Sequence, residues 1–249
     1  MNTNKISYNK YVAEIIGTLM LVLVVALSGA GLSAIVFAGM VLAFIVYLFG
    51  DVSGAHVNPA FTIAALTMKK IKWQDAVLYI CSQLIGAAIA LIILKNIPDF
   101  KFMDLGTAMP ELSMMTIFMA EIVGSAIFAM AFSAVLHGRT TKSNAGFVIG
   151  MGLFFGLLAA NIMTKGVGMV NPAVSIGTNV INWATIIGPI VGALIGAWLY
   201  KFIVLGKLCD KDSACGSDNE SNCCGESKED AVDSSSDSVV IIEEIEVVK

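Results

Sequence analysis

The chain has 249 residues, 57% of them hydrophobic and only 14% charged, and its mean hydropathy is +0.83. This composition excludes a soluble globular domain and indicates an integral membrane protein. The net charge of −4 is unevenly spread, because residues 1–205 carry eleven Lys and Arg against seven Asp and Glu, whereas residues 206–249 carry four against twelve. We therefore expect a mildly basic membrane domain over 1–205 and a separate acidic tail over 206–249.

Six apolar runs are long enough to cross a membrane as helices. They lie near residues 11–27, 32–49, 77–94, 114–136, 145–163 and 185–205. The polar first ten residues precede no small-residue cleavage site, so we predict that the first span is retained and is not a signal peptide. The longest connection, residues 95–113, contains Pro98 and Pro110, which interrupt helical continuity.

A tripeptide occurs twice, as Asn58-Pro59-Ala60 and as Asn171-Pro172-Ala173. Asn is a preferred helix N-cap and Pro is favoured at the first helical position, so each copy predicts the start of a helix. About eleven residues at roughly 1.5 Å each give a helix that spans only half of a ~30 Å bilayer core. If two such half-helices enter from opposite faces, their N–H groups and Asn amides meet near the midplane, where irregular backbone normally lines a pore.

The distribution of Lys and Arg predicts the orientation. With the N-terminus inside, the cytoplasmic ends carry Lys5, Lys10, Lys69, Lys70, Lys72, Arg139, Lys142, Lys201 and Lys207. Both termini are then cytoplasmic, the first tripeptide enters from the cytoplasm and the second from outside. Three spans separate the two copies, so the repeats, about 10–95 and 114–205, are inverted.

Two carboxylates occupy matching positions in the first span of each repeat. Glu14 and Glu121 both follow Ala in an Ala-Glu-x-x-Gly-Thr/Ser pattern. A carboxylate inside a span costs a few kcal/mol, so we expect both to face the bundle and bind the unpaired N–H groups of the half-helix loops. The alternative for Glu14 is that it extends to the membrane interface. Gln83 in the third span is expected to form hydrogen bonds within the bundle.

With these features, and with the motifs at 53–60, 83–87 and 188–193, residues 10–205 resemble the aquaporin (major intrinsic protein) family. The resemblance implies an all-α membrane protein with six transmembrane helices and two half-helices in an inverted repeat, assembled as a homotetramer with one pore per subunit. It implies that Asn58 and Asn171 hold the permeating molecule at the centre of the pore. It also implies that His56 lines the cytoplasmic half.

The outer selectivity filter departs from the family pattern, because Val174 stands where the family typically has Arg. Counting from the motifs places the other filter positions at Ala38, Ala159 and Gly168, with Ala160 or Val167 as alternatives to the last two if the loop is shifted by one residue. All are small and apolar, whereas water-selective members commonly have an aromatic residue and a His at the first two. The resemblance thus implies a wide outer constriction without a fixed positive charge; Lys165 is the only cation nearby.

The acidic tail is rich in Ser, Asp, Glu and Gly and is expected to be disordered. Cys209, Cys215, Cys223 and Cys224 lack the paired spacing of a metal site, so no metal is predicted. The apolar run 239–242, followed by two acids, resembles a motif that binds small protein modifiers by strand addition, although such short strings also arise by chance.

These features predict a passive channel for water or small uncharged solutes of the size of glycerol, urea or ammonia. The alternative is a membrane scaffold of the same fold that recruits a partner through its tail. We expect no enzymatic activity, because no nucleophile, base and orienting group converge. The expected partners are the lipid bilayer, water, small neutral solutes and other copies of the chain; no cofactor and no nucleic acid is expected.

Overall fold

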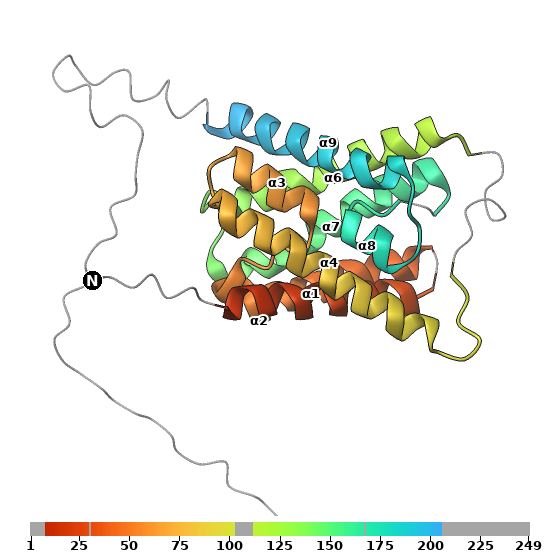
Figure 1. The fold of residues 1–249 in the computed structure, drawn as a ribbon. Helices are drawn as coiled ribbons and strands as arrows, with labels where there is room; N and C mark the ends of the chain where they lie inside the picture. Colours follow the sequence, from red (N-terminus) through yellow and green to blue (C-terminus); the bar gives the residue numbers. More distant parts are fainter. Residues whose placement is uncertain (1–7, 30, 103–111, 167, 206–249) are drawn as a thin grey trace, which may run out of the picture. The chain divides into compact units, whose positions relative to one another are not determined.

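The computed structural model describes residues 8–29, 31–102, 112–166 and 168–205. The chain divides into two units, Met1–Lys207 and Leu208–Lys249, and all the described residues lie in the first. Helices are the only regular structure in these residues, and six of them are long and apolar enough to cross a membrane. These are α1 (Asn9–Leu27), α2 (Leu32–Ser53), α4 (Trp73–Lys95), α6 (Met114–Leu136), α7 (Lys142–Thr164) and α9 (Trp183–Tyr200), the last continued by the π-helical turn η1 (Lys201–Leu205). The predicted all-α class with six spans is confirmed (Figure 1); the predicted disordered tail lies outside the described residues.

Several helices extend beyond the apolar runs that predicted them. Helix α2 continues to Ser53 rather than residue 49, and α4 begins at Trp73 rather than residue 77. Asp75 lies in the first turn of α4 and Lys95 in its last turn, where each charge is favoured by the helix dipole. Hydropathy locates the part of a helix that lies in hydrocarbon, whereas the helix itself ends where its caps allow.

Two short helices, α3 (Pro59–Thr67) and α8 (Pro172–Gly177), follow the repeated tripeptides. They have nine and six residues, fewer than the eleven expected from sequence. Each ends at a left-handed residue, Lys69 after α3 and Asn179 after α8, with φ of 59° and 60°. The next N–H turns back to the helix, from Lys70 to Ala65 O (2.9 Å) and from Val180 to Ser175 O (2.8 Å), which satisfies carbonyls at the helix end.

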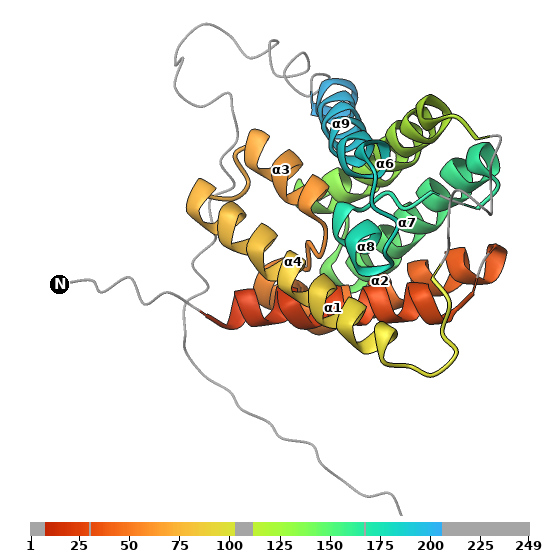
Figure 2. The same cartoon turned by 45° about the vertical axis from the view of Figure 1, so that its right-hand side comes forward.

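The helices pack as two equivalent halves. Helix α1 contacts α2 and α4, just as α6 contacts α7 and α9. Each short helix reaches into the other half, since α3 packs against α9 and α8 packs against α4. Figures 1 and 2 show α3 near the end of the bundle at which α1 begins and α8 near the opposite end. The two half-helices therefore meet inside the bundle from opposite directions, as the inverted repeat predicts.

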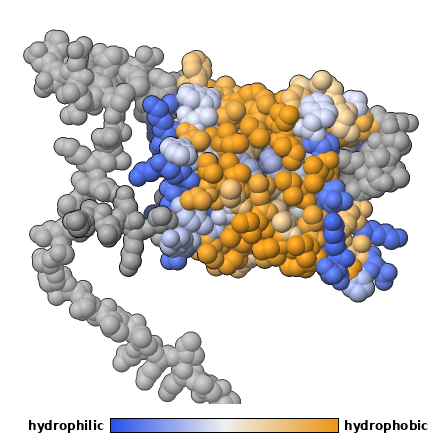
Figure 3. Space-filling model, in the orientation of Figure 1, coloured by the Kyte–Doolittle hydropathy of each residue, from blue (hydrophilic) through white to orange (hydrophobic). Residues whose placement is uncertain are grey.

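The surface is divided as a bilayer requires. Large apolar side chains such as Phe44, Ile92 and Phe202 are exposed along the helices, and Figure 3 shows an apolar band between two hydrophilic ends. We call the end at which α1 begins the basic end. Its basic residues are Lys10, Lys69, Lys70, Lys72, Arg139, Lys142 and Lys201. The protein is an integral multi-pass membrane protein; which end faces the cytoplasm stays a prediction.

Glycines allow the closest helix contacts. A Cβ on Gly192 of α9 would meet the backbone of Ile122 in α6, and one on Gly196 would meet the backbone of Ala126. Gly17 and Gly124 leave room for Val57 and Val170, whose Cγ1 atoms would lie 2.7 Å from an added Cβ. The glycines of the repeated Ala-Glu-x-x-Gly pattern therefore fit the loops that precede the half-helices.

Gly192→Ala is expected to destabilise the protein by about 1–3 kcal/mol, because the added methyl group meets backbone atoms that cannot move aside. Thermal unfolding in detergent measures the change. Gly50→Ala is the matched control, since a Cβ there would have ordinary contact at 3.5 Å with Val46. Equal unfolding temperatures of the two variants would contradict this account of the α6–α9 contact.

Candidate functional site: a pore between two half-helices

The loop before α3 is held by one buried carboxylate. Glu14 of α1 is fully buried and accepts four hydrogen bonds. They come from Ser53 Oγ (2.7 Å) and His56 N (2.9 Å) to Oε1, and from Val57 N (2.7 Å) and Gln83 Nε2 (2.7 Å) to Oε2. With four donors on its two oxygens, the carboxylate needs no water at this depth. Glu14 therefore faces the bundle rather than the interface, and Gln83 lies beside it.

The loop before α8 is held in the same way. Glu121 of α6 is fully buried and accepts from Met169 N through Oε1 and from Val170 N through Oε2, both at 2.7 Å. Two consecutive backbone N–H groups thus bind the two oxygens of one carboxylate. Val170 corresponds to Val57 in the first half, because each directly precedes the Asn of its tripeptide.

The two halves differ in the helix that packs beside the buried carboxylate, which is α4 in the first half and α9 in the second. Gly86 of α4 and Gly192 of α9 hold matching positions, since each lies against the backbone carbonyl of the residue after the buried Glu. Three residues earlier stand Gln83 in α4 and Pro189 in α9. Proline cannot donate a hydrogen bond to Glu121, so the counterpart of the Gln83 donor is absent. Among the described residues, Glu121 accepts from two donors and Glu14 from four.

Pro189 has a different use. A proline inside a helix leaves the carbonyl four residues earlier without its N–H partner. That carbonyl, Thr185 O, shares the single hydroxyl hydrogen of Ser175 in α8 with Asn171 O, each 3.2 Å from Ser175 Oγ. The matching hydroxyl of α3, Thr62 Oγ1, instead accepts from Gln83 Nε2 at 3.0 Å. One hydroxyl therefore links each half-helix to the span that follows it. Ser175 of α8 donates to α9, whereas Thr62 of α3 accepts from α4.

The valines before the two Asn residues have left-handed backbone. Val57 has φ of 40° and Val170 has φ of 49°, a conformation that costs a β-branched residue on the order of 1–3 kcal/mol. This turn directs each carbonyl at the opposite loop. Asn58 Nδ2 donates to Val170 O (3.0 Å) and Asn171 Nδ2 donates to Val57 O (2.9 Å).

Each Asn also caps its own half-helix. Asn58 Oδ1 accepts from Ala60 N and Asn171 Oδ1 accepts from Ala173 N, both at 2.9 Å. Pro59 and Pro172 occupy the first helical position, where no N–H is required. The amide thus uses its oxygen and one of its two N–H bonds internally, and the second N–H stays available to a molecule at the centre.

Three cavities follow one another through the ring of helices. The central cavity, of about 20 Å³, is lined by both Asn residues and is large enough for about one water molecule. A cavity of about 370 Å³ lies on its side toward the opposite end, where α1 finishes, and shares Gly168 and Met169 with it. A cavity of about 430 Å³ lies toward the basic end and shares His56 with it. We call these the central, outer and inner cavities.

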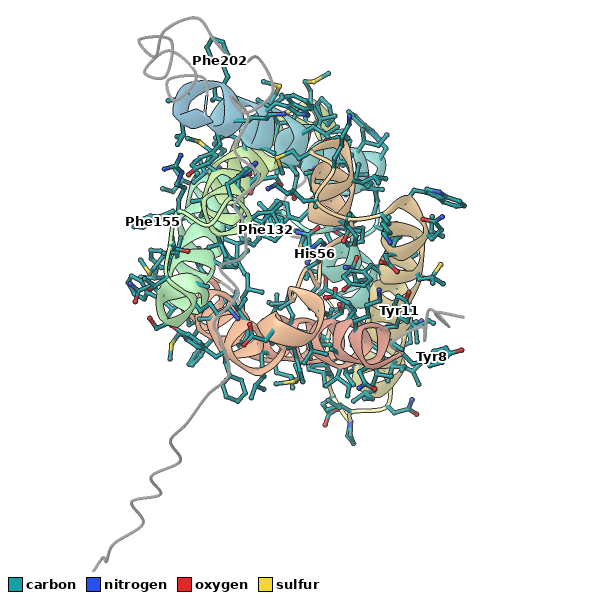
Figure 4. The ribbon with its side chains drawn as sticks, turned by 90° about the vertical axis from the view of Figure 1, so that its left-hand side faces the viewer. Tyr8, Tyr11, His56, Phe132, Phe155 and Phe202 are labelled. Atoms are coloured by element: carbon teal, nitrogen blue, oxygen red, sulfur yellow. The ribbon has the colours of Figure 1, made fainter. Side chains whose placement is uncertain are left out.

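His56 marks the junction of the central and inner cavities. Its ring lies edge-on to Tyr79 and to Phe132, with centroid distances of 5.3 Å to each, and its Nδ1 is 3.2 Å from Thr62 Oγ1. Figure 4 shows His56 and Phe132 at the rim of the open centre of the bundle. The imidazole therefore faces the passage, with one ring nitrogen fixed by a hydroxyl.

Three of the four filter positions predicted from sequence line the central cavity: Ala38, Gly168 and Val174. Ala159 lines none of the three cavities. Residues four apart share a helix face, and α7 instead presents Leu153, Leu157 and Asn161 to the cavities.

Two alternative filter positions were also named from sequence. Ala160 lies behind Gly168, whose added Cβ would be 2.5 Å from Ala160 Cβ. Val167 lies outside the described residues. Lys165 lines none of the three cavities.

The central cavity is narrower than the small filter residues suggested. Leu21, Leu157 and Met169 also line it, so its wall includes long side chains beside the small residues at the filter positions. Sequence reasoning missed Leu21 and Leu157 because neither belongs to a motif. Only the helical spacing from Leu153 to Leu157 and Asn161 could have identified the α7 face. Among the described residues, no group of three His, Cys, Asp or Glu side chains is arranged to hold a metal ion.

Two opposed half-helices whose Asn amides meet in a narrow cavity define a membrane channel. The chain belongs to the major intrinsic protein family, whose model matches residues 1–200. It is a passive channel for water or small solutes and not an enzyme.

Individual relatives agree with this assignment. The chain is 31% identical over 211 residues to the probable aquaporin NIP7-1 of Arabidopsis thaliana, covering 78% of this chain and 76% of the relative. It is 34% identical over 209 residues to the glycerol uptake facilitator protein-like 6 of Lactiplantibacillus plantarum, covering 76% and 95%. The aquaglyceroporin of Plasmodium falciparum shares the fold, with a TM-score of 0.58 and 18% identity over 80% of this chain and 97% of that one.

Glu121→Ala is expected to reduce the yield of folded protein, because it leaves the N–H groups of Met169 and Val170 without partners, at about 1–3 kcal/mol each. Thermal unfolding and the monodisperse yield in detergent measure this loss. Asp51→Ala is the control, because Asp51 pairs with Lys142 on the surface and its side chain is 83% exposed. A stable Glu121→Ala protein with altered selectivity alone would show that Glu121 acts in the pore instead.

Proposed function

We propose that the channel conducts water and small uncharged solutes past Asn58 and Asn171, with His56 lining the passage. The observation that carries this proposal is the central cavity, in which two amides and the imidazole of His56 stand in an otherwise apolar wall, without a single Asp, Glu, Lys or Arg among its lining residues. A permeating molecule finds hydrogen-bond donors there but no charge to balance an ion. The N-termini of α3 and α8 add positive potential, which opposes cations.

We propose that Ala38, Gly168 and Val174, with Leu157 of α7 in place of Ala159, form the outer filter. No arginine fixes its width, so the flexible side chains of Met169 and Leu157 limit the size of the solute. Their displacement opens the passage to molecules of the size of glycerol or urea. The name of the Lactiplantibacillus relative, glycerol uptake facilitator protein-like 6, supports a solute of that size.

We further propose a homotetramer with cytoplasmic termini, following the family resemblance and the basic residues of the basic end. The domains are the channel, 1–205, and the acidic tail, 206–249. Deleting 206–249 separates a channel from a scaffold that acts through its tail: a channel conducts without the tail, whereas a scaffold loses its partner.

Asn58→Ala and Asn171→Ala are expected to lower water permeability and to admit small cations, because each removes an amide donor from the central cavity. Stopped-flow light scattering of proteoliposomes gives the water permeability, and a sodium-sensitive dye gives the leak. Asn182→Ala is the matched control: Asn182 caps α9 through Ala184 N and Thr185 N and lines none of the three cavities. If both pore variants behave like this control, the central role of the two amides is refuted.

Val174→Arg is expected to block glycerol and urea while water still passes, because the guanidinium adds bulk and charge beside Gly168. The measurement compares glycerol, urea and water flux in proteoliposomes of wild type and variant. If the wild type passes water alone, the larger-solute part of the proposal is wrong.

A further inference from the structure

Asn161 of α7 presents a hydrogen-bond acceptor to the outer cavity. Its Nδ2 donates to Leu157 O at 2.8 Å and lies 3.4 Å from Gly168 O. Both neighbours are carbonyl oxygens, which only accept, so the NH₂ end of the amide must face them and its orientation is determined. Oδ1 has no hydrogen-bond partner within residues 8–29, 31–102, 112–166 and 168–205. Asn161 lines the outer cavity, and this oxygen is the atom that remains for a solute there.

A second acceptor lines the same cavity. Thr178, at the C-terminal end of α8, donates its hydroxyl hydrogen to Val174 O at 2.8 Å. Met169 Sδ is a weaker partner at 3.9 Å. Because a hydroxyl has one hydrogen, Thr178 Oγ1 can only accept from a molecule in the cavity. The exposed Lys101 is the one ammonium that the described residues place on the cavity wall, and water solvates it.

Acceptors in the outer cavity and donors in the central cavity stand in series. A solute that enters from the outer side meets Asn161 Oδ1 and Thr178 Oγ1 first and the amide N–H groups of Asn58 and Asn171 next. Asn161 Oδ1 and Thr178 Oγ1 form hydrogen bonds only with molecules that carry N–H or O–H groups. A molecule that only accepts finds no donor in this pair, and the one ammonium that the described residues place on the wall, Lys101, is exposed.

We propose that Asn161, assisted by Thr178, is a specificity-determining residue that selects small neutral solutes with several N–H or O–H donors. Urea, with four N–H bonds, is the probe for this class. The inference rests on the proposed function, since it requires that solutes larger than water pass the central cavity. It assigns selection to a residue outside the four filter positions identified from sequence.

The test is the ratio of urea to water permeability in proteoliposomes, measured by stopped-flow light scattering for wild type, Asn161→Leu and Asn161→Ala. Both substitutions remove the acceptor, but Leu keeps the volume of the side chain and Ala reduces it. We expect both to lower the ratio about five- to tenfold, the factor that corresponds to one lost hydrogen bond to a neutral group. Thr178→Val is expected to lower it in the same direction.

Asn96→Leu is the matched control. Asn96 makes the same bond, from Nδ2 to the carbonyl four residues earlier at 2.8 Å, but it is exposed at the end of α4 and lines none of the three cavities. If Asn161→Ala raises urea permeability while Asn161→Leu leaves the ratio unchanged, Asn161 acts through size alone and the inference is overturned. An unchanged ratio in both variants, in a wild type that passes urea, overturns it while the proposed function stands. A wild type that passes water but no urea overturns the inference, and it counts against the larger-solute part of the proposed function while water conduction stands.

Discussion

The structure depends on a carboxylate that binds the backbone N–H groups of a loop in left-handed conformation. Val57 and Val170 adopt a backbone that disfavours β-branched residues. Each keeps it because a buried Glu binds its N–H at 2.7 Å and a glycine leaves room for its side chain. The charge and the strain are each unfavourable alone. Together each compensates for the other: the loop supplies the hydrogen-bond donors that a buried carboxylate needs, and the carboxylate holds the strained turn in place.

That turn determines what the pore centre offers. Once the valine carbonyls point across the interface, each accepts from the Asn of the other loop. One N–H of each Asn amide therefore forms a hydrogen bond across the two loops, which fixes the orientation of the amide. The remaining N–H then has a defined direction even without a ligand. The pore donors are preorganised by the same two contacts that join the halves of the protein, and a solute need not order them on binding.

Much of this arrangement can be predicted from the sequence. The parts that cannot be predicted all have the same cause. The six spans, the half-helix starts and the roles of Glu14, Glu121 and Gln83 follow from apolar length, capping chemistry and the cost of buried polar groups. Which α7 residues line the cavities depends on the rotation of that helix, and counting residues back from Asn171 crosses a loop whose path the count cannot give. Ala159 and Leu157 are two residues apart, and on a helix that separation turns a side chain to the other face.

The same limit applies to the width of the passage. Small residues at the filter positions indicate a wide passage only if no long side chain lines the same cavity, and here Met169 and Leu157 line it. Composition alone does not separate such residues from the core, because an apolar residue next to a pore resembles one in the core; only the helical spacing of Leu153, Leu157 and Asn161 distinguishes that face of α7.

The shortness of α8 need not weaken the centre of the pore. A helix exerts its field mainly through the free N–H groups of its first turn, so a helix of six residues contributes nearly what a longer one does at its N-terminus. The residues that α8 lacks relative to α3 lie at its C-terminal end, away from the central cavity. Thr178 there becomes a cap whose hydroxyl oxygen reaches the outer cavity. Ending the helix early therefore leaves the electrostatics of the two half-helix N-termini almost equal, while it gives the two mouths of the channel different chemistry.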